Sequence, residues 1–423
     1  MNYSSTFCIL PWLHLYVQPN GEVAPCCHAD LARPCGSVAE SDLKAIFNSE
    51  SFKRIRRDML NGERSQECAS CYRLEDVHKS SPRQNHNREF QRHLEKVNHT
   101  LPDGSLQELS LVYLDLRFSN VCNLKCRGCY PGSSSSWAED FEQLTGAKVT
   151  KKLSNLNAPA MQEILAHLDH VENIYFAGGE PLIMQENYLL LDKLIELKRT
   201  NIALLYNTNL MQLSHGKYDI LDYWKKFNNV MVSASMDDIL ERAEYFRKGL
   251  DFKVFTNNWK RIRKESPHIQ LSINLTVNIM NVFSLDKIFD YFNQELDLEH
   301  TQYSFNLLTS PPELSIQVLP LTFKQEVKAK LEAYQRDLSS KLSRKFLAQL
   351  QKGVKEEKLF DMIIARKKEA EVNYLDPIIT FMMNGSGEAS IQDFFARTEK
   401  LDRIRGEDYR KLFPELVRVR ASY

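Results

Sequence analysis

The pattern of hydrophobic and polar positions changes character along the 423 residues of the chain. Residues 1–75 contain short apolar runs separated by turn signals, and residues 76–108 are mostly polar. Residues 109–315 alternate short apolar runs with stretches of helical periodicity, whereas residues 316–423 are charged and helical in pattern. The pattern predicts a small amino-terminal module, a linker, a strand–helix core and a helical carboxy-terminal extension.

The core is predicted to hold six strand–helix units. The expected strands are Leu111–Phe118, Asn173–Phe176, Ile202–Tyr206, Val230–Ala234, Gln270–Val277 and Tyr303–Leu308. The expected helices are Met161–Leu168, Tyr188–Lys198, Lys217–Phe227, Leu240–Phe246, Thr256–Lys264 and Leu285–Phe292. Such an alternation is typical of an α/β fold with a parallel sheet, open or curled into a partial barrel. In these sheets chemistry takes place at the carboxyl ends of the strands.

The flanking segments give weaker patterns. The apolar run Leu13–Val17, a turn, and Glu22–Cys26 predict a small hairpin, because turn residues separate two strand-like runs. Ser41–Leu60 is expected to be a helix, and the linker to be partly helical. Residues 322–372 and Ile391–Leu416 have helical spacing, the latter interrupted by Gly406 and Pro414.

Composition narrows the class of protein. With 43% hydrophobic and 26% charged residues the chain is expected to be soluble and globular. Its 55 basic and 55 acidic residues cancel, so we expect neither nucleic acid nor an acidic membrane as a partner. No apolar run approaches the roughly 18 residues that span a bilayer. The first twenty residues lack the Lys and Arg of a signal peptide, so no signal peptide is expected. We therefore expect the protein to be located in the cytoplasm.

The nine cysteines are clustered. Six lie in the first 71 residues, and Cys122, Cys126 and Cys129 follow the first expected core strand. Clustered cysteines without a secretory signal argue against a disulfide framework and for metal or iron–sulfur ligation. Three thiolates fill three iron sites of a [4Fe–4S] cubane and leave the fourth iron open. A zinc site would require a fourth ligand nearby, and the next histidine is His167.

This spacing, with Tyr130 beside the last cysteine and the run Ala177–Pro181 after the second strand, resembles the radical S-adenosylmethionine (radical SAM) superfamily. The resemblance implies a partial (β/α)6 barrel and bound S-adenosylmethionine. It implies cofactor contacts at Tyr130, Gly178, Gly179, Glu180, Pro181, Asn207, Asn209, Ser233, Ser235, Asp237 and Arg247. Among them Glu180 would hold the methionyl amino group and Arg247 the methionyl carboxylate. For single strand-end residues a capped turn is the alternative interpretation.

The amino-terminal cysteines resemble a second family feature. Their spacing is similar to that of the SPASM/twitch auxiliary-cluster module, which in most relatives follows the barrel and here precedes it. The resemblance implies an auxiliary [4Fe–4S] cluster held by Cys8, Cys26, Cys68 and Cys71, with Cys27 as the substitute for Cys26. A zinc site with four cysteine ligands remains an alternative. The tail that includes Phe394, Asp402 and Gly406 resembles twitch-domain radical SAM proteins.

The resemblance also implies a type of reaction. A reduced cluster donates one electron to S-adenosylmethionine, and the resulting 5′-deoxyadenosyl radical abstracts hydrogen from a substrate. An external one-electron reductant such as flavodoxin or ferredoxin is implied, and the auxiliary cluster would assist net oxidation. Peptide or protein side chains rank first as substrates, and carbohydrates or aminocyclitols second. An iron–sulfur electron carrier or a zinc-bearing binding protein is the alternative outside enzymes. Asp237 and Asp238 are proton-transfer candidates by position only.

Overall fold

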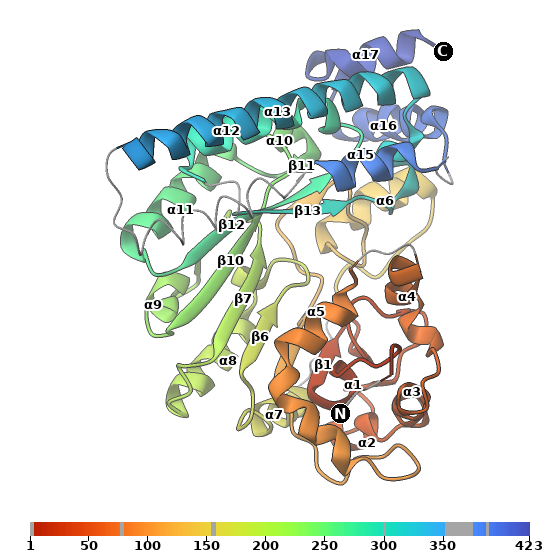
Figure 1. Cartoon of the computed structure of the whole chain (residues 1–423), viewed down its shortest axis with the longest axis vertical. Helices are drawn as coiled ribbons and strands as arrows, with labels where there is room; N and C mark the ends of the chain where they lie inside the picture. Colours follow the sequence, from red (N-terminus) through yellow and green to blue (C-terminus); the bar gives the residue numbers. More distant parts are fainter. Residues whose placement is uncertain (1–3, 77–79, 154–157, 299–301, 352–374, 386–388) are drawn as a thin grey trace. The chain divides into compact units, whose positions relative to one another are not determined.

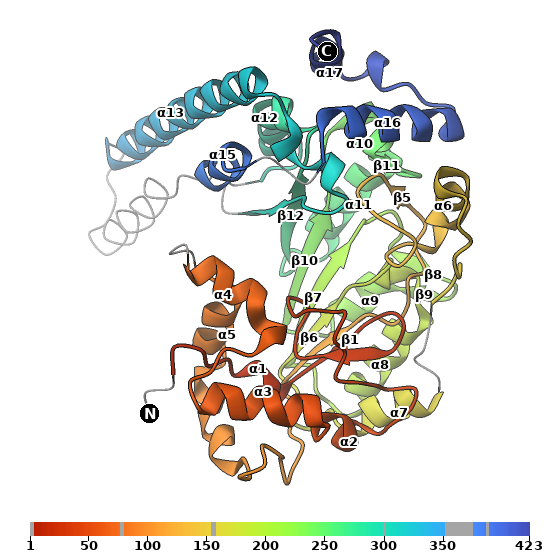
Figure 2. The same ribbon diagram turned by 90° about the vertical axis from the view of Figure 1, so that its right-hand side faces the viewer.

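The computed structural model describes residues 4–76, 80–153, 158–298, 302–351, 375–385 and 389–423 (Figures 1 and 2). The chain forms two compact units. The first comprises Met1–Lys125, Cys129–Ser235 and Gly249–Ile273. The second comprises Cys126–Gly128, Met236–Lys248 and Asn274–Tyr423.

A mostly parallel sheet is the frame of the first unit. The strands β4 (Tyr113–Leu116), β6 (Asn173–Phe176), β7 (Ala203–Thr208) and β10 (Asn229–Ser235) are consecutive neighbours, and each pair is parallel (Figure 1). β12 (Gln270–Val277) begins in this unit and continues into the second, which also holds β13 (Tyr303–Leu307). All six predicted core strands are therefore present, and the α/β prediction is confirmed.

One face of this sheet is packed under helices. The ring of Phe176 stacks on Tyr206 at 4.5 Å, and Tyr206 meets Trp224 of α9 (Ile220–Trp224) at 5.1 Å between ring centroids. The Tyr206 hydroxyl donates to Oδ1 of Asn187 in α8 (Gln185–Glu196) over 2.9 Å. Burial alternates along β6, β7 and β10 with a period of two, so the opposite face is only half-buried.

The predicted amino-terminal hairpin is confirmed, and it extends the same sheet. β1 (His14–Val17) pairs antiparallel with β2 (Glu22–Ala24), which pairs with β3 (Gly36–Ser37). On its other side β1 pairs in parallel with β4 of the core, Tyr16 standing opposite Asp115. The amino-terminal strand is therefore an integral member of the core sheet, which periodicity alone did not predict.

The amino-terminal helices differ from the predicted ones in their limits. The single helix expected over residues 41–60 is two helices, α2 (Leu43–Phe47) and α3 (Glu50–Leu60), because Ser49 caps α3 by accepting a bond from the Phe52 N–H. The linker contains α5 (Pro82–Glu89), which begins with a capping box, and the 3-10 helix η2 (Gln91–His99).

The core helices lie where the periodicity predicted them. They are α7 (Ala158–Ala166), α8, α9, α10 (Leu240–Phe246), α11 (Phe252–Glu265) and α12 (Leu285–Glu295). The helix expected over residues 217–227 is shorter, because Tyr218–Asp219 forms β9 beside β8 (Ser214–His215). The Asp219 carboxylate then caps α9 by accepting from the Leu221 N–H at 2.9 Å.

The carboxy-terminal part of the second unit is helical. It contains α13 (Leu321–Gln351), α15 (Asp376–Met383), α16 (Ile391–Arg405) and α17 (Pro414–Ala421) (Figure 1). Helix α16 ends at Gly406 in the left-handed conformation (φ +66°), and Pro414 opens α17, as predicted. The predicted helical region beyond Gln351, up to residue 372, lies outside the described residues. Among the described residues, no helix is long and apolar enough to cross a bilayer.

Candidate functional site

Polar and aromatic side chains gather on the half-buried face of the sheet in the first unit, here called the polar face. It carries Tyr16, Tyr113, Asp115, Arg117, Tyr175, Asn207 and Ser233, which share one side by strand register. The Arg117 guanidinium lies 4.9 Å from the Tyr16 ring centroid and 3.3 Å from the Asp115 carboxylate. Burial raises the pKa of Asp115, although Arg117 acts in the opposite direction.

The loop after β4 carries the first cysteine of the core. The Cys122 sulfur accepts from the Leu124 N–H at 3.4 Å and from the Asn209 side-chain amide at 4.0 Å. The same amide donates to Oδ1 of Asn123 over 2.8 Å, which orients it. Hydrogen bonds to sulfur stabilise a thiolate and tune a cluster that it ligates. Asn209, predicted as a cofactor contact, thus lies directly beside a predicted iron ligand.

In the second unit, Cys126 lies near Arg247, which follows α10 and is a predicted cofactor contact. Nη1 of Arg247 is 3.8 Å from the Cys126 sulfur, and its Nη2 is 2.8 Å from Oδ2 of Asp237. Asp237 also accepts from the Thr276 N–H at 2.8 Å. The structure therefore brings Arg247 and Asp237 together in one ion pair. Asp237 holds the guanidinium in place, a role that its position in the sequence did not indicate.

The two glycines of the predicted methionyl-binding run are packed against the cysteine loop. A Cβ at Gly179 would lie 2.1 Å from the Val121 carbonyl oxygen, which backbone cannot accommodate. The N–H of Gly179 donates to the Ser119 carbonyl (3.1 Å), and that of Glu180 to the Val121 carbonyl (2.8 Å). Gly178 has φ +110°, a conformation that favours glycine. The turn Gly178–Glu180, here called the glycine turn, therefore packs directly against the backbone that leads to Cys122.

Glu180 is buried and joins this turn to the end of β7. One carboxylate oxygen accepts from the Thr208 hydroxyl (2.7 Å) and the Leu182 N–H (3.1 Å), and the other from the Asn209 N–H (2.7 Å). Pro181 starts the short 3-10 helix η4 (Pro181–Ile183) that Glu180 caps. These bonds fix the carboxylate between the turn and the carboxyl end of β7.

The remaining predicted contacts differ in setting. Asn207 and Ser233 stand opposite each other on the polar face, and Ser235 ends β10 two residues further on. Tyr130 is 61% exposed, with its ring over Gly132, and hence lies on the surface in this structure. Asp238 is buried against Arg242 at 3.1 Å, and burial raises its pKa to about 6.

The amino-terminal cysteines form a neighbouring set of thiols in the first unit. Burial raises the pKa of Cys8 to about 12, with Cys71 acting in the same direction. The pKa of Cys26 is raised by burial and by its neighbours Cys27, Cys8 and Cys68, and that of Cys68 by burial, Cys8 and Cys71. Hydrogen bonds join the segments that carry these cysteines: the Tyr72 hydroxyl donates to the Thr6 carbonyl at 2.9 Å, and the Ser70 hydroxyl to the His28 carbonyl at 2.6 Å.

Cys27 faces a different environment from its neighbour Cys26. Burial, followed by the nearby Asp115 carboxylate, raises the pKa of its thiol to about 12. The side chain is therefore directed to the polar face. Cys35 is buried near Glu67, which after burial contributes most to its raised pKa.

Side chains from the linker hold the segment around Cys8. The Asn87 side chain donates to the Phe7 carbonyl and accepts from the Ile9 N–H, both over 2.8 Å. Arg83 donates to the carbonyls of Phe7 and Ser5, the latter at 2.7 Å. Sequence reasoning missed these residues, because a polar helix gives no sign of which distant backbone it will bind.

By donor type, both sets of cysteines suit iron–sulfur ligation. None of the nine cysteines forms a disulfide. Within the described chain, no three His, Cys, Asp or Glu side chains converge closely enough for a single metal ion. Ligands of a cubane bind different irons and so lie farther apart than ligands of one ion. A metal that binds a cysteine replaces the thiol proton, so a bound cluster would hold these sulfurs as thiolates.

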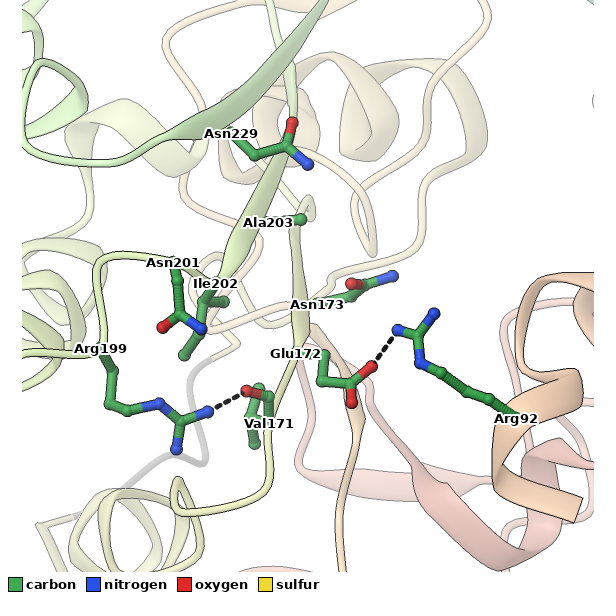
Figure 3. Close-up of a pocket in the computed structure, with 9 residues that line it drawn as sticks. All are labelled: Arg92, Val171, Glu172, Asn173, Arg199, Asn201, Ile202, Ala203 and Asn229. Carbon is green, nitrogen blue, oxygen red and sulfur yellow. Dashed lines mark hydrogen bonds and ion pairs between the residues drawn. The ribbon is translucent and has the colours of Figure 1, made fainter.

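A separate cavity lies at the opposite end of the strands. Its volume is about 320 Å³, and Figure 3 shows Arg92 paired with Glu172 and Arg199 donating to the Val171 carbonyl at its wall. Asn173, Ala203 and Asn229, the first residues of β6, β7 and β10, also line it. The cavity therefore lies at the amino ends of these strands. Cys122, a predicted cluster ligand, follows the carboxyl end of β4, so the cavity and the predicted cluster site lie at opposite ends of the parallel strands.

Solved structures similar to this chain have low identity to it. The structure of anSMEcpe with bound AdoMet is 17% identical and covers 66% of this chain and 68% of its own (TM-score 0.38). With AdoMet and a peptide, that protein is 15% identical and covers 74% and 99% (TM-score 0.40). Streptococcus suis SuiB bound to S-adenosylmethionine is 14% identical and covers 79% and 69% (TM-score 0.36). These similarities do not establish a common substrate. No curated protein matches the chain.

Two family models match the chain itself. Residues 8–72 match the SPASM iron–sulfur cluster-binding domain, and residues 116–284 match the Radical SAM superfamily. The first range contains the set of neighbouring thiols, and the second contains Cys122, the glycine turn and Arg247. The family implies [4Fe–4S] clusters and S-adenosylmethionine as cofactors. The chain therefore contains a radical SAM domain, residues 116–284, preceded by a SPASM iron–sulfur domain, residues 8–72.

Proposed function

We propose that this radical SAM enzyme oxidises a peptide or protein side chain with the help of an auxiliary cluster. The observation that carries the proposal is the set of Cys8, Cys26, Cys68 and Cys71, whose segments are joined by hydrogen bonds, in a chain that has three further cysteines in its core. Four protein ligands leave no open iron on the auxiliary cluster, which favours electron transfer over substrate binding. The cluster would then accept the electron that remains after hydrogen abstraction.

Cys122, Cys126 and Cys129 are proposed to hold the radical SAM cluster. When bound, S-adenosylmethionine and this cluster supply a 5′-deoxyadenosyl radical. Asn209 and Arg247 orient the ligating sulfurs through their N–H groups. Glu180, whose carboxylate is held at the carboxyl end of β7, is proposed to bind the methionyl ammonium group, and Arg247 its carboxylate.

The polar face is proposed to orient the cofactor and the substrate. Asn207, Ser233 and Ser235 offer hydrogen-bonding groups for the cofactor, which fits the roles implied by the family. The buried Asp115 holds Arg117, whose side chain is 26% exposed and offers donors to the carbonyl groups of a polypeptide. An aminocyclitol or carbohydrate is the second candidate, because hydroxyl oxygens accept from the same guanidinium.

The proposal places the enzyme in a reducing compartment. The radical SAM cluster requires a one-electron reductant such as flavodoxin or ferredoxin, and cysteine thiols persist in a reducing compartment. We therefore expect the enzyme to act in the cytoplasm. A non-catalytic iron–sulfur carrier would need no glycine turn or Arg247, which distinguishes it from the proposed enzyme.

The test begins with anaerobic reconstitution. About eight irons per chain, four for each cubane, are expected. With dithionite and S-adenosylmethionine, 5′-deoxyadenosine should form, and replacing Cys122, Cys126 and Cys129 by Ala should abolish it. Peptide mixtures and aminocyclitols are then compared by mass spectrometry for products that have lost two hydrogens. Persistent 5′-deoxyadenosine in the triple variant contradicts the proposed ligands, and oxidation of the aminocyclitols alone contradicts the peptide substrate.

A further inference from the structure

A buried arginine lies within the cysteine motif of the second unit. Arg127 follows Cys126 directly, and its side chain is 1% exposed. Its Nη2 contacts Oδ1 of Asp402 and lies 2.6 Å from Oε2 of Glu407. Both carboxylates come from the end of α16 and the turn after it, about 275 residues along the chain. A buried guanidinium requires such partners, because an unpaired charge is costly in a protein interior.

The same carboxylates bind several other groups of this unit. The Tyr245 hydroxyl donates to Oδ1 of Asp402 at 2.7 Å, and burial raises the pKa of Tyr245, which keeps the hydroxyl protonated. The other oxygen of Asp402 accepts from the Tyr409 N–H at 2.8 Å. Lys248 pairs with Glu407 at 2.9 Å. Two cations and two carboxylates thus balance in one network.

The backbone of the motif is fastened to the same place. The Arg127 N–H donates to the Phe246 carbonyl at 2.7 Å, and its Nε donates to the Tyr245 carbonyl at 3.3 Å. The guanidinium also stacks over the Tyr245 ring at 3.8 Å. Arg127 is consequently fixed on one side by the end of α10 and on the other by the carboxy-terminal segment.

We infer that the segment Asp402–Tyr409 is a positioning element of the radical SAM cluster site. Asp402 and Glu407 hold Arg127, and Arg127 in turn fixes Cys126, whose sulfur also accepts from Arg247. This inference rests on the proposed assignment of Cys122, Cys126 and Cys129 as ligands. A loop that must keep one iron open needs ligands in fixed positions, and a solvated arginine would not provide this.

The test measures iron rather than turnover alone. Asp402→Asn is reconstituted anaerobically beside the wild type and the variant with all three core cysteines replaced by Ala. The triple variant defines the iron of this cluster, about four per chain. We expect Asp402→Asn to lose more than half of that iron, and its electron paramagnetic resonance spectrum to lose the response to S-adenosylmethionine.

Glu415→Gln is the matched control, because Glu415 pairs with Arg242 at 2.6 Å in the same unit and does not contact Arg127. It should retain its iron. If Asp402→Asn keeps full iron and the spectral response while the triple variant loses its iron, the inference is wrong and the ligand assignment stands. If the triple variant loses no iron, the assignment itself fails.

A second variant covers the case in which Asp402→Asn does not fold. Replacing Arg127 by Met and Asp402 by Leu together removes both charges and leaves Glu407 paired with Lys248. Circular dichroism establishes that this double variant is folded. Loss of the cluster iron from the folded double variant supports the inference, and full iron retention overturns it.

Discussion

At the scale of single residues, two adjacent cysteines have separate environments. Cys26 lies among the thiols of the amino-terminal set, whereas Cys27 lies near Asp115 of the polar face. The chain turns here, and the Ala29 N–H donates to the Cys26 carbonyl at 3.2 Å with Cys27 inside the turn, so the two side chains leave the backbone in different directions. The sequence left the choice between them open, because both residues have the same spacing to the other cysteines.

Replacing the two cysteines should therefore have different effects. Cys26→Ser is expected to lose about four irons per chain, the content of one cubane, and Cys27→Ser to keep them. Iron analysis after anaerobic reconstitution measures the difference, and each variant serves as the control of the other. Equal iron loss in both variants would mean that Cys27 also supports the cluster.

Gly179 should not tolerate a side chain. Gly179→Ala places a Cβ against the Val121 carbonyl, and we expect a loss of about 1–3 kcal/mol in the free energy of unfolding. Gly128→Ala is the control, because its Cβ would meet only side-chain atoms at 3.4 Å or more. Thermal or denaturant unfolding measures both. Equal stability of the two variants would contradict the close packing of the turn.

At the scale of elements, the polar helix α5 stabilises the backbone around Cys8. Asn87→Ala removes two hydrogen bonds to Phe7 and Ile9, and we expect it to cost about 1–3 kcal/mol of unfolding free energy. Asn85→Ala in the same helix is the control, since Asn85 is exposed. Chemical denaturation followed by circular dichroism compares them. An effect of Asn85→Ala as large as that of Asn87→Ala would argue against a specific clamp.

The elements show how far the sequence can predict this fold. Period-two and helical patterns located the core strands and most helices, because each pattern arises from local burial. They missed the break at Ser49 and the β9 turn, where a side chain caps a helix. The parallel pair of β1 and β4 was also missed, since strands almost one hundred residues apart pair through contacts that periodicity does not record.

The candidate site was predictable to a similar extent. Cysteine spacing and the position of the glycine turn after β6 carried the family assignment. The partners of these residues were not predictable: Asp237 pairs with Arg247 across α10, Glu180 with Thr208 over 28 residues, and Arg127 with Asp402 over 275 residues of the chain. Such pairs depend on the three-dimensional packing of complete elements.

At the scale of the molecule, the amino-terminal module also protects the core sheet. Deleting residues 1–75 would remove β1 and leave β4 with an open edge, which favours aggregation. We expect the truncated chain to aggregate in size-exclusion chromatography. A full-length chain with Cys8, Cys26, Cys68 and Cys71 replaced by Ser should remain monodisperse, because it keeps β1. A monodisperse truncated chain would show that the core folds independently.

The pairing of β1 with β4 has a consequence for exchanging modules between enzymes. Tyr16 stands opposite Asp115 and reaches Arg117 only in the observed register. Inserting one residue into β1 would turn Tyr16 to the far side and bring an aliphatic side chain in its place. The module is therefore not interchangeable like a domain on a flexible tether. A chimaera would have to keep β1 in the same register and would have to include β4, the strand with which β1 pairs.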